Sequence, residues 1–134
     1  MKKNSVLKFT DYVVDEIIFK NNYSDEESFN IDFDIDSNVN FKDETNFELH
    51  MVVELFKSLD ISPFKMRVKV TGFFQIESME AGKKENFVKQ NAVAILFPYV
   101  RALISNYTAL CNVPPLILPP INVVEYIKNK SSEI

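Results

Sequence analysis

The sequence has little of the residues from which small catalytic and metal sites are usually built. Its 134 residues include one cysteine, one histidine, two glycines and no tryptophan. A single cysteine excludes an internal disulfide framework and fits a reducing compartment such as the cytoplasm. Two isolated glycines cannot form a loop that cradles a phosphate. No apolar stretch follows the basic N-terminus, so we expect no signal peptide.

The unique histidine and the unique cysteine, His50 and Cys111, could in principle form a nucleophilic dyad. No third group that would orient the histidine can be identified from the sequence. We therefore expect a surface histidine, a small apolar residue at the end of a helix, and no catalytic residues. The chain is predicted not to be an enzyme and to need no cofactor.

Three aspartates at alternating positions, Asp32, Asp34 and Asp36, resemble the start of a calcium loop. Such a loop needs glycine at its sixth position and a bidentate glutamate at its twelfth, and here those positions hold Ser37 and Asp43. The apolar residues between the aspartates indicate a strand instead, so no metal site is predicted. The three carboxylates then form one solvated strand face.

Charge is divided unevenly along the chain. Residues 1–60 contain 14 acidic and 6 basic residues, whereas residues 61–134 contain 5 acidic and 9 basic ones. An acidic first half argues against a nucleic-acid partner and favours a basic protein surface as partner. We expect Asp32, Asp34 and Asp36 to present this acidic face.

Four stretches have the composition or the alternation of β-strands: residues 6–20, 29–41, 47–55 and 64–70. Short polar segments separate them, so the simplest arrangement is an antiparallel meander with one solvated face. On that face Lys65, Arg67 and Lys69 could pair with Glu48 and Glu54. Gly72 suggests a bulge in the last strand, and residues 79–85 are predicted to be a polar connection.

A helix is predicted from a start between Asn86 and Asn91 to Leu110, with Pro98 either kinking it or marking its regular start. Its apolar residues cover more than one face, so its own sheet cannot bury all of them and a second subunit is expected. Polar residues interrupt the segment too often for a membrane span. The residues predicted to form the oligomer interface are Ile95, Tyr99, Val100, Ala102, Leu103 and Asn106.

The segment Val113–Ile121, V-P-P-L-I-L-P-P-I, contains four prolines, five aliphatic residues and no charge. Proline fixes φ and disfavours helix in the preceding residue, so an extended or polyproline-like loop is predicted. Apolar side chains on such a loop either lie near solvent or cover a groove, which is typical of a binding site. Asn122 followed by Glu125 resembles a capping box that begins a short last helix.

Three motifs of this region resemble the SecB export-chaperone family. They are G-F-F-Q-I-E at residues 72–77, F-P-Y-V-R-A-L-I-S at 97–105 and P-P-L-I-L-P-P-I-N at 114–122. The same order of last strand, helix and proline-rich crossover occurs in that family. Pattern and resemblance together predict one α+β domain over residues 1–134, with a four-stranded antiparallel sheet, one long helix, a proline-rich crossover loop and a short C-terminal helix.

The resemblance implies a cytoplasmic, ATP-independent holdase that assembles as a dimer of dimers and inserts into no membrane. Its clients would be unfolded preproteins, and its further partner the SecA translocation ATPase. The client would lie in an apolar groove between the crossover loop, the last helix and the sheet. The residues expected to line the groove are Phe33, Ile35, Phe74, Val113, Leu116, Leu118, Ile121 and Val124.

Alternatives remain open from the sequence. Many SecB proteins continue into a longer acidic tail that docks on SecA, whereas this sequence stops soon after its last predicted helix. A dedicated chaperone of a toxin–antitoxin module or of another single client is therefore an alternative. A small-ligand carrier using the same groove, or a purely structural subunit, is a further one.

Overall fold

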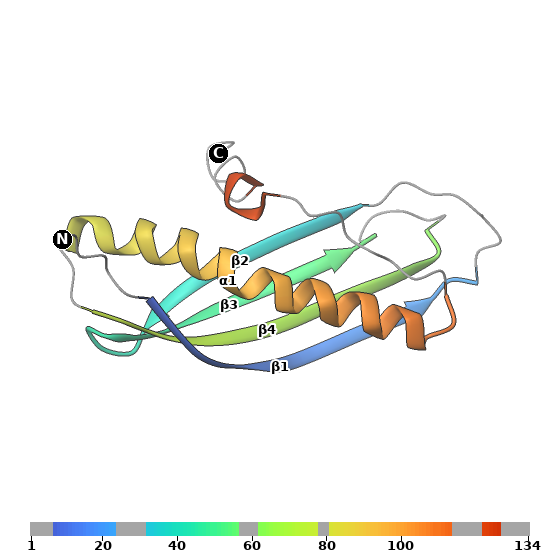
Figure 1. Cartoon of the computed structure of the whole chain (residues 1–134). Coiled ribbons are helices and arrows are strands. Elements are labelled where there is room, and N and C mark those ends of the chain that lie inside the picture. The colour runs from blue at the N-terminus through green and yellow to red at the C-terminus, as the bar shows by residue number, and fades with distance from the viewer. Residues whose placement is uncertain (1–6, 24–31, 57–61, 78–80, 114–121, 127–134) are drawn as a thin grey trace.

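The computed structural model describes residues 7–23, 32–56, 62–77, 81–113 and 122–126. Among these residues it contains four strands: β1 (Leu7–Asn21), β2 (Phe33–Phe41), β3 (Asn46–Leu55) and β4 (Phe64–Ile76). One long helix, α1 (Ala81–Leu110), follows them, and a short helix spans residues 123–126. Figure 1 shows the helix lying along the sheet. The predicted α+β architecture is thus confirmed.

The strands form one antiparallel sheet in the order β1-β4-β3-β2. The predicted meander is therefore right for β2, β3 and β4 and wrong for β1, which lies beside β4 rather than β2. The 15 residues of β1 find a partner of similar length in β4, which has 13, whereas β2 has only 9. The result is a Greek-key order, with β1 and β2 at opposite edges of the sheet (Figure 1).

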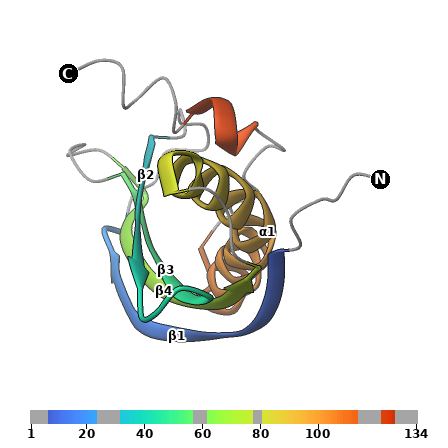
Figure 2. The ribbon, with the colours of Figure 1, turned by 90° about the vertical axis from the view of Figure 1, so that its left-hand side faces the viewer.

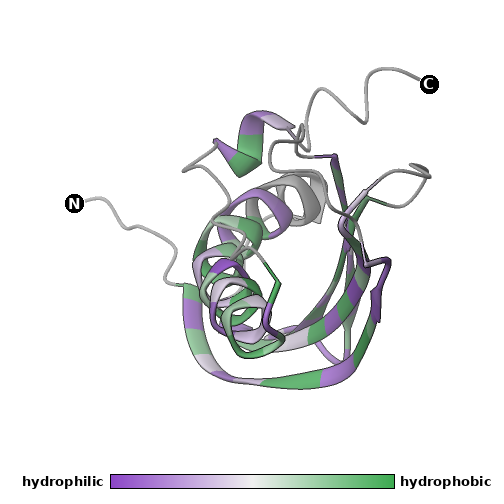
Figure 3. Cartoon of the chain, turned by 90° about the vertical axis from the view of Figure 1, so that its right-hand side faces the viewer, coloured by the Kyte–Doolittle hydropathy of each residue, from purple (hydrophilic) through white to green (hydrophobic). Residues whose placement is uncertain are grey.

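The sheet curves around α1, as Figure 2 shows, and its inner face is apolar because alternate residues of each strand point toward the helix. The hydropathy colours of Figure 3 change accordingly along the strands. The helix buries one stripe on this face, consisting of Val88, Ala92, Val93, Leu96, Phe97, Val100 and Ile104. A row of directly paired phenylalanines crosses the inner face of all four strands, Phe9, Phe74, Phe47 and Phe41, with successive ring centroids 5.2 Å apart.

Gly72 does not form the predicted bulge, because β3 and β4 pair in continuous register through it. Its role is to let the helix approach the sheet. A Cβ atom at this position would lie 2.9 Å from Cε1 of Phe74 and 3.3 Å from both methyl carbons of Leu96. The register shifts are instead in β1, where Thr10 and Asp15 are the extra residues opposite β4.

The helix begins earlier than predicted, at Ala81, so residues 81–85 of the expected polar connection are helical. Pro98 lies inside the helix and does not mark its start. The Pro98 side chain is exposed, on the side of α1 away from the sheet. Proline is therefore tolerated there at the cost of one backbone hydrogen bond, because its ring meets no packed neighbour.

The β2–β3 hairpin is closed by a turn around Asp43. Its carboxylate accepts hydrogen bonds from the side-chain amide of Asn46 at 3.0 Å and from the backbone amides of Thr45 and Asn46, both at 2.8 Å. These hydrogen bonds, that of the Asn46 side chain first, lower the pKa of Asp43 from 3.8 to about 2.

We predict that the free energy of unfolding depends less on acidic pH in Asp43→Asn than in the wild type. Because the folded-state pKa is lowered, the charged Asp43 stabilises the folded protein above about pH 3.8, and this contribution is lost as the pH falls toward about 2. Urea unfolding should show a stability difference between wild type and Asp43→Asn that shrinks over this interval. Asp11→Asn is the control, because it alters an exposed carboxylate that accepts a hydrogen bond from the Tyr12 amide. A difference that stays constant with pH would contradict the prediction.

Candidate functional site

The predicted groove residues occupy two kinds of position. Phe33, Val113 and Val124 are half-buried and pack at the margin of the core. Ile35 and Phe74 are 0% and 2% exposed, so in this conformation they belong to the core and offer a client no contact. The other predicted groove residues, Leu116, Leu118 and Ile121, lie outside the described residues.

The short helix at residues 123–126 is fixed to the start of β2. Its first turn is capped by the Asn122 side chain, which accepts a hydrogen bond from the Glu125 amide at 3.1 Å, as the capping box predicts. Val123 is 6% exposed and joins the core. Tyr126 stacks on Phe33 with ring centroids 5.6 Å apart and donates its hydroxyl to Oδ1 of Asp34 at 3.1 Å. Half-buried apolar surface of Phe33, Val124 and Tyr126 therefore meets at this edge of the sheet, and we call these three residues the β2 rim.

Asp34 and Asp36 of β2 and Asp32, which precedes the strand, differ in exposure. Asp36 is exposed, Asp34 is half-buried and accepts the Tyr126 hydroxyl, and Asp32 is half-buried with one carboxylate oxygen shielded from solvent. Further carboxylates share the outer face of the sheet with them. Asp15 and Glu16 come from β1, and Glu48 and Glu54 from β3.

Basic residues of β4 offset part of this acidic surface. Arg67 lies 3.5 Å from Glu54, as predicted, and also 3.5 Å from Glu16 of β1. Glu48 pairs with His50 and Lys42 rather than with β4. The contribution of β1 could not be predicted, because the bulge at Asp15 changes which residues of that strand point outward.

The predicted interface residues on α1 range from exposed to fully buried. Tyr99 is 44% exposed, and Ala102 and Asn106 are also exposed. Ile95 and Leu103 are half-buried. The remaining predicted residue, Val100, is 1% exposed because it packs on the protein's own sheet. The free side of the helix therefore runs through Tyr99, Ala102 and Asn106.

Sequence reasoning missed an exposed apolar area on β1 that adjoins this side of the helix. Tyr12 and Val14 are 36% and 42% exposed, and the rings of Tyr12 and Phe9 lie 5.2 and 5.3 Å from that of Tyr99. We call Tyr12, Val14 and Tyr99 the β1–α1 patch. The exposed β-branched residues of β1 were a signal for it, but without the strand order they could equally belong to a central strand.

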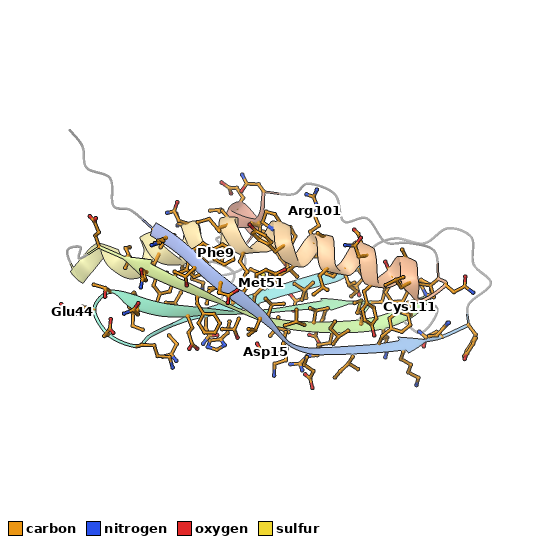
Figure 4. All side chains as sticks on the ribbon, turned by 60° about the horizontal axis from the view of Figure 1, so that its bottom comes forward. Phe9, Asp15, Glu44, Met51, Arg101 and Cys111 are labelled. Carbon is orange, nitrogen blue, oxygen red and sulfur yellow. The ribbon has the colours of Figure 1, made fainter. Side chains whose placement is uncertain are left out.

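No dyad forms between His50 and Cys111. His50 lies on the outer face of β3, where it contacts Glu48 and Thr71, whereas Cys111 follows α1 on the inner face. Figure 4 shows Cys111 at the far end of the helix. In the part of the chain that the structure describes, no group of three or more His, Cys, Asp or Glu side chains could hold a metal ion.

The segment Val88–Leu110 is long and apolar enough to cross a membrane, by length and composition alone. Core helices can pass the same test, and here one face of the segment packs on the apolar side of the sheet. The packing of this face on the sheet therefore explains part of the apolar character of the helix. The rest belongs to the exposed side described above.

A comparison with protein-family models matches residues 9–133 to SecB, the preprotein translocase subunit. The chain belongs to the SecB family. An uncharacterized protein of Methanocaldococcus jannaschii is 37% identical over 95% of this chain and 90% of its own length. The protein-export protein SecB of Cellvibrio japonicus is 32% identical over 69% of this chain and 56% of its own length. The chain thus spans little more than half of that bacterial SecB.

Solved structures show the SecB fold at low sequence identity. A SecB-like chaperone of Mycobacterium tuberculosis, in complex with a ChAD peptide from the HigA1 antitoxin, superimposes with a TM-score of 0.72 and 13% identity over 86% of this chain and 89% of its own. A protein of unknown function from Streptococcus agalactiae reaches a TM-score of 0.54, also at 13% identity, over 87% of this chain and 99% of its own.

The first SecB motif lies beside the start of the second in the folded chain. Gly72 of the first motif lies beneath Leu96, the residue that precedes the second motif. Within the second motif Phe97 is buried at 3% exposure, whereas Tyr99 is 44% exposed and belongs to the β1–α1 patch. The motifs therefore fix how the helix lies on the sheet and which side it leaves exposed.

We predict that Tyr126 holds the short helix on β2. Tyr126→Phe should cost about 0.5–1.5 kcal/mol, the usual net worth of one hydrogen bond, because it removes the hydroxyl that donates to Asp34 and keeps the ring. Tyr126→Ala should cost more, because it also removes the stacking on Phe33. Urea unfolding and hydrogen exchange of the β2 amides measure both effects. Tyr23→Phe, at a residue 86% exposed, is the matched control; equal stability of Tyr126→Ala and wild type would contradict the prediction.

Proposed function

We propose that the protein is an ATP-independent holdase that binds unfolded preproteins and keeps them competent for export. Membership of the SecB family supports a chaperone role, and the family is one of chaperones rather than enzymes. The observation that carries the proposal is the β2 rim, where Phe33, Val124 and Tyr126 keep part of their apolar surface accessible. The cytoplasm is the proposed location, because a preprotein is met there before export.

The mechanism that we propose is physical. An extended client places apolar side chains against the β2 rim and the proline-rich segment that ends at Asn122. Each buried side chain contributes about 1.5–3 kcal/mol, less the cost of ordering the client. Affinity then depends on how many apolar residues a client offers, so many sequences can bind. Several sites on one oligomer would add avidity.

We propose assembly into a dimer of dimers through the surface that the fold leaves uncovered. Tyr99, Ala102 and Asn106 form the free side of α1, and the β1–α1 patch continues this side onto the edge of the sheet. Exposed apolar areas of this kind usually mark protein interfaces. Small side chains such as Ala102 also permit a second helix to approach closely.

SecA is the partner that we propose for the outer face of the sheet. Asp36, Glu16, Glu48 and Glu54 supply acidic groups there. A basic partner would meet this charge with an affinity that falls as salt is added.

A dedicated chaperone is the second candidate. The SecB-like chaperone of Mycobacterium tuberculosis, which shares the fold, was solved with a peptide from an antitoxin. Competition distinguishes the candidates: several unrelated unfolded proteins should displace one another from a general holdase. A dedicated chaperone would retain one peptide against all of them.

We predict that apolar-to-polar changes around the β2 rim weaken client binding. Phe33→Ser with Val124→Ser should lower the affinity for an unfolded reduced protein by roughly 2–4 kcal/mol, the burial of two side chains less partial compensation. The same loss is expected for Leu116→Ser with Leu118→Ser. Fluorescence anisotropy of the labelled client measures it.

Val52→Ser is the control, because Val52 is half-buried on the outer face of the sheet, away from the proposed groove. Its affinity should match that of the wild type. Normal client binding by both double variants, with their fold and oligomeric state intact, would place the client site elsewhere.

We predict that Ala102→Glu disrupts the oligomer. A carboxylate on the free side of α1 would be buried without a partner in a helix interface, which costs several kcal/mol. Sedimentation velocity at micromolar concentration should show a tetramer for wild type and a smaller species for the variant. Gln75→Glu places the same charge at an exposed position of β4 and should leave the tetramer intact. A wild type that sediments as a monomer would refute the assembly.

A further inference from the structure

Phe56, the residue that follows β3, has a backbone conformation that bulky residues rarely adopt. Its φ is 56°, in the left-handed region, and its side chain is 0% exposed. Among the residues that the structure describes, two other non-glycine residues share this conformation. Asn112 follows α1, where asparagine often ends a helix in this way, and Tyr23 is 86% exposed. Of the three, Phe56 is the one that is buried.

The left-handed backbone carries the Phe56 ring to the inner face of the sheet. Successive side chains of a strand point to opposite faces, and the preceding Leu55 already points inward with 0% exposure. One more residue of regular strand would therefore place Phe56 on the outer face. Instead its ring meets that of Phe64 edge-on, with centroids 5.1 Å apart, and Phe64 in turn stacks on Phe19. A strained backbone is thus accepted so that an aromatic ring fills this space.

The space that Phe56 fills lies beside the β2 rim. The Phe56 amide donates a hydrogen bond to the carbonyl oxygen of Asp32 at 2.7 Å, and Leu55 pairs directly with Phe33 of the rim. Figure 1 shows the end of β3 next to the start of β2. The proposed client site therefore adjoins a space that already has the shape of an aromatic ring.

We propose that Phe56 is a displaceable plug of the client site, and that an aromatic side chain of a bound client takes its place against Phe64. This inference rests on the proposed holdase function and adds a moving part to it. When Phe56 leaves, its backbone can return from the left-handed to the extended region, which offsets part of the lost burial. The client ring then fills the same space. Exchange of one ring for another therefore costs less than the opening of an ordinary packed core.

A plug of this kind has two consequences for the chaperone. Without a client it keeps the pocket filled, so that no additional apolar surface is exposed to other molecules. With a client it lowers the apparent affinity by the fraction of molecules in which the plug is out. A client without an aromatic residue cannot refill the pocket and has to bind at the β2 rim alone.

Fluorine NMR of the full chain, with 4-fluorophenylalanine placed only at position 56, tests the displacement directly. The probes are a short unstructured apolar peptide with one central phenylalanine and its twin with leucine at that place. Binding of the phenylalanine peptide should move the fluorine signal from its buried position to that of a solvent-exposed ring. Binding of the leucine twin should leave the signal where it is.

The outcomes separate this inference from the proposed function. Peptide binding with an unchanged fluorine signal would overturn the plug and leave the holdase function intact. An equal change of the signal with both peptides would overturn the aromatic preference. If the protein bound neither the peptides nor an unfolded reduced protein, the holdase function would be refuted, and the plug with it.

Phe56→Gly supplies a second measurement, because it removes the plug and relaxes the backbone. Its affinity for the phenylalanine peptide should exceed that of wild type about tenfold or more, since minor states are usually populated at no more than about 10%. The affinity for the leucine twin should change less. An affinity for the phenylalanine peptide equal to or below that of wild type would show that Phe56 is ordinary core and would overturn the proposal.

The strain itself is measured by urea unfolding of Phe56→Gly and Phe56→Ala. The glycine variant should be the more stable, with unfolding constants about fivefold or more apart, because glycine adopts a positive φ without steric cost. The same pair of substitutions at Val52, inside the regular part of β3, is the control and should give the opposite order. A more stable alanine variant at position 56 would overturn the proposal. If neither variant folds, the fluorine signal still decides.

Discussion

The close approach of α1 to the sheet at Gly72 is the constraint on which the rest of the structure depends. The Phe74 ring, at 2.9 Å, and the Leu96 methyl groups, at 3.3 Å, occupy the space that a Cβ atom at this position would need. Core packing is sensitive to single methyl groups, so this contact fixes the height and rotation of the helix above the sheet. The rotation decides that Val100 faces inward while Tyr99 and Ala102 face outward. The core and the exposed side of the helix are thus both set by one missing side chain.

The two faces of the sheet are held by different interactions. Apolar burial holds the inner face, where the phenylalanine row joins all four strands. Hydrogen bonds and ion pairs join β1, β3 and β4 on the outer face, through Arg67 and through the Thr71 hydroxyl, which contacts Asp15 and His50. The first kind of interaction is insensitive to pH and salt, whereas the second responds to both. Changes of pH or salt should therefore act mainly on the outer face of the sheet.

Elements with strong local patterns could be predicted from the sequence. The alternation of Phe33, Ile35, Val39 and Phe41 identified β2, and the capping pair Asn122 and Glu125 identified the short helix, because both depend on neighbouring residues. The place of β1 could not be predicted, since the choice between two neighbours rests on contacts distant in sequence. For the same reason the bulge at Asp15 could not be predicted. The contacts of Thr71 with Asp15 and His50 could not be predicted either.

For the candidate site, too, the sequence predicts some features and not others. Phe33, Val113 and Val124 are half-buried, and their place in a client groove stays a prediction. The nearly complete burial of Ile35 and Phe74 could not be predicted. A periodic pattern shows which face of a strand a residue lies on, but not how completely other elements cover that face. The exposure of Tyr99 and Val14 could not be predicted either, because it depends on how the helix lies beside β1.

The position of β1 has a consequence for the order in which the chain folds. β2, β3 and β4 follow one another and can pair as they leave the ribosome, but the first strand must wait for Phe64–Ile76, the last of the four, before it gains a neighbour. Pairing between distant segments is slow, because the loop must close before any contact forms. During synthesis β1 therefore spends the longest time as an extended, partly apolar segment without a partner. A protein of this topology is, for part of its own synthesis, the kind of chain that a holdase binds.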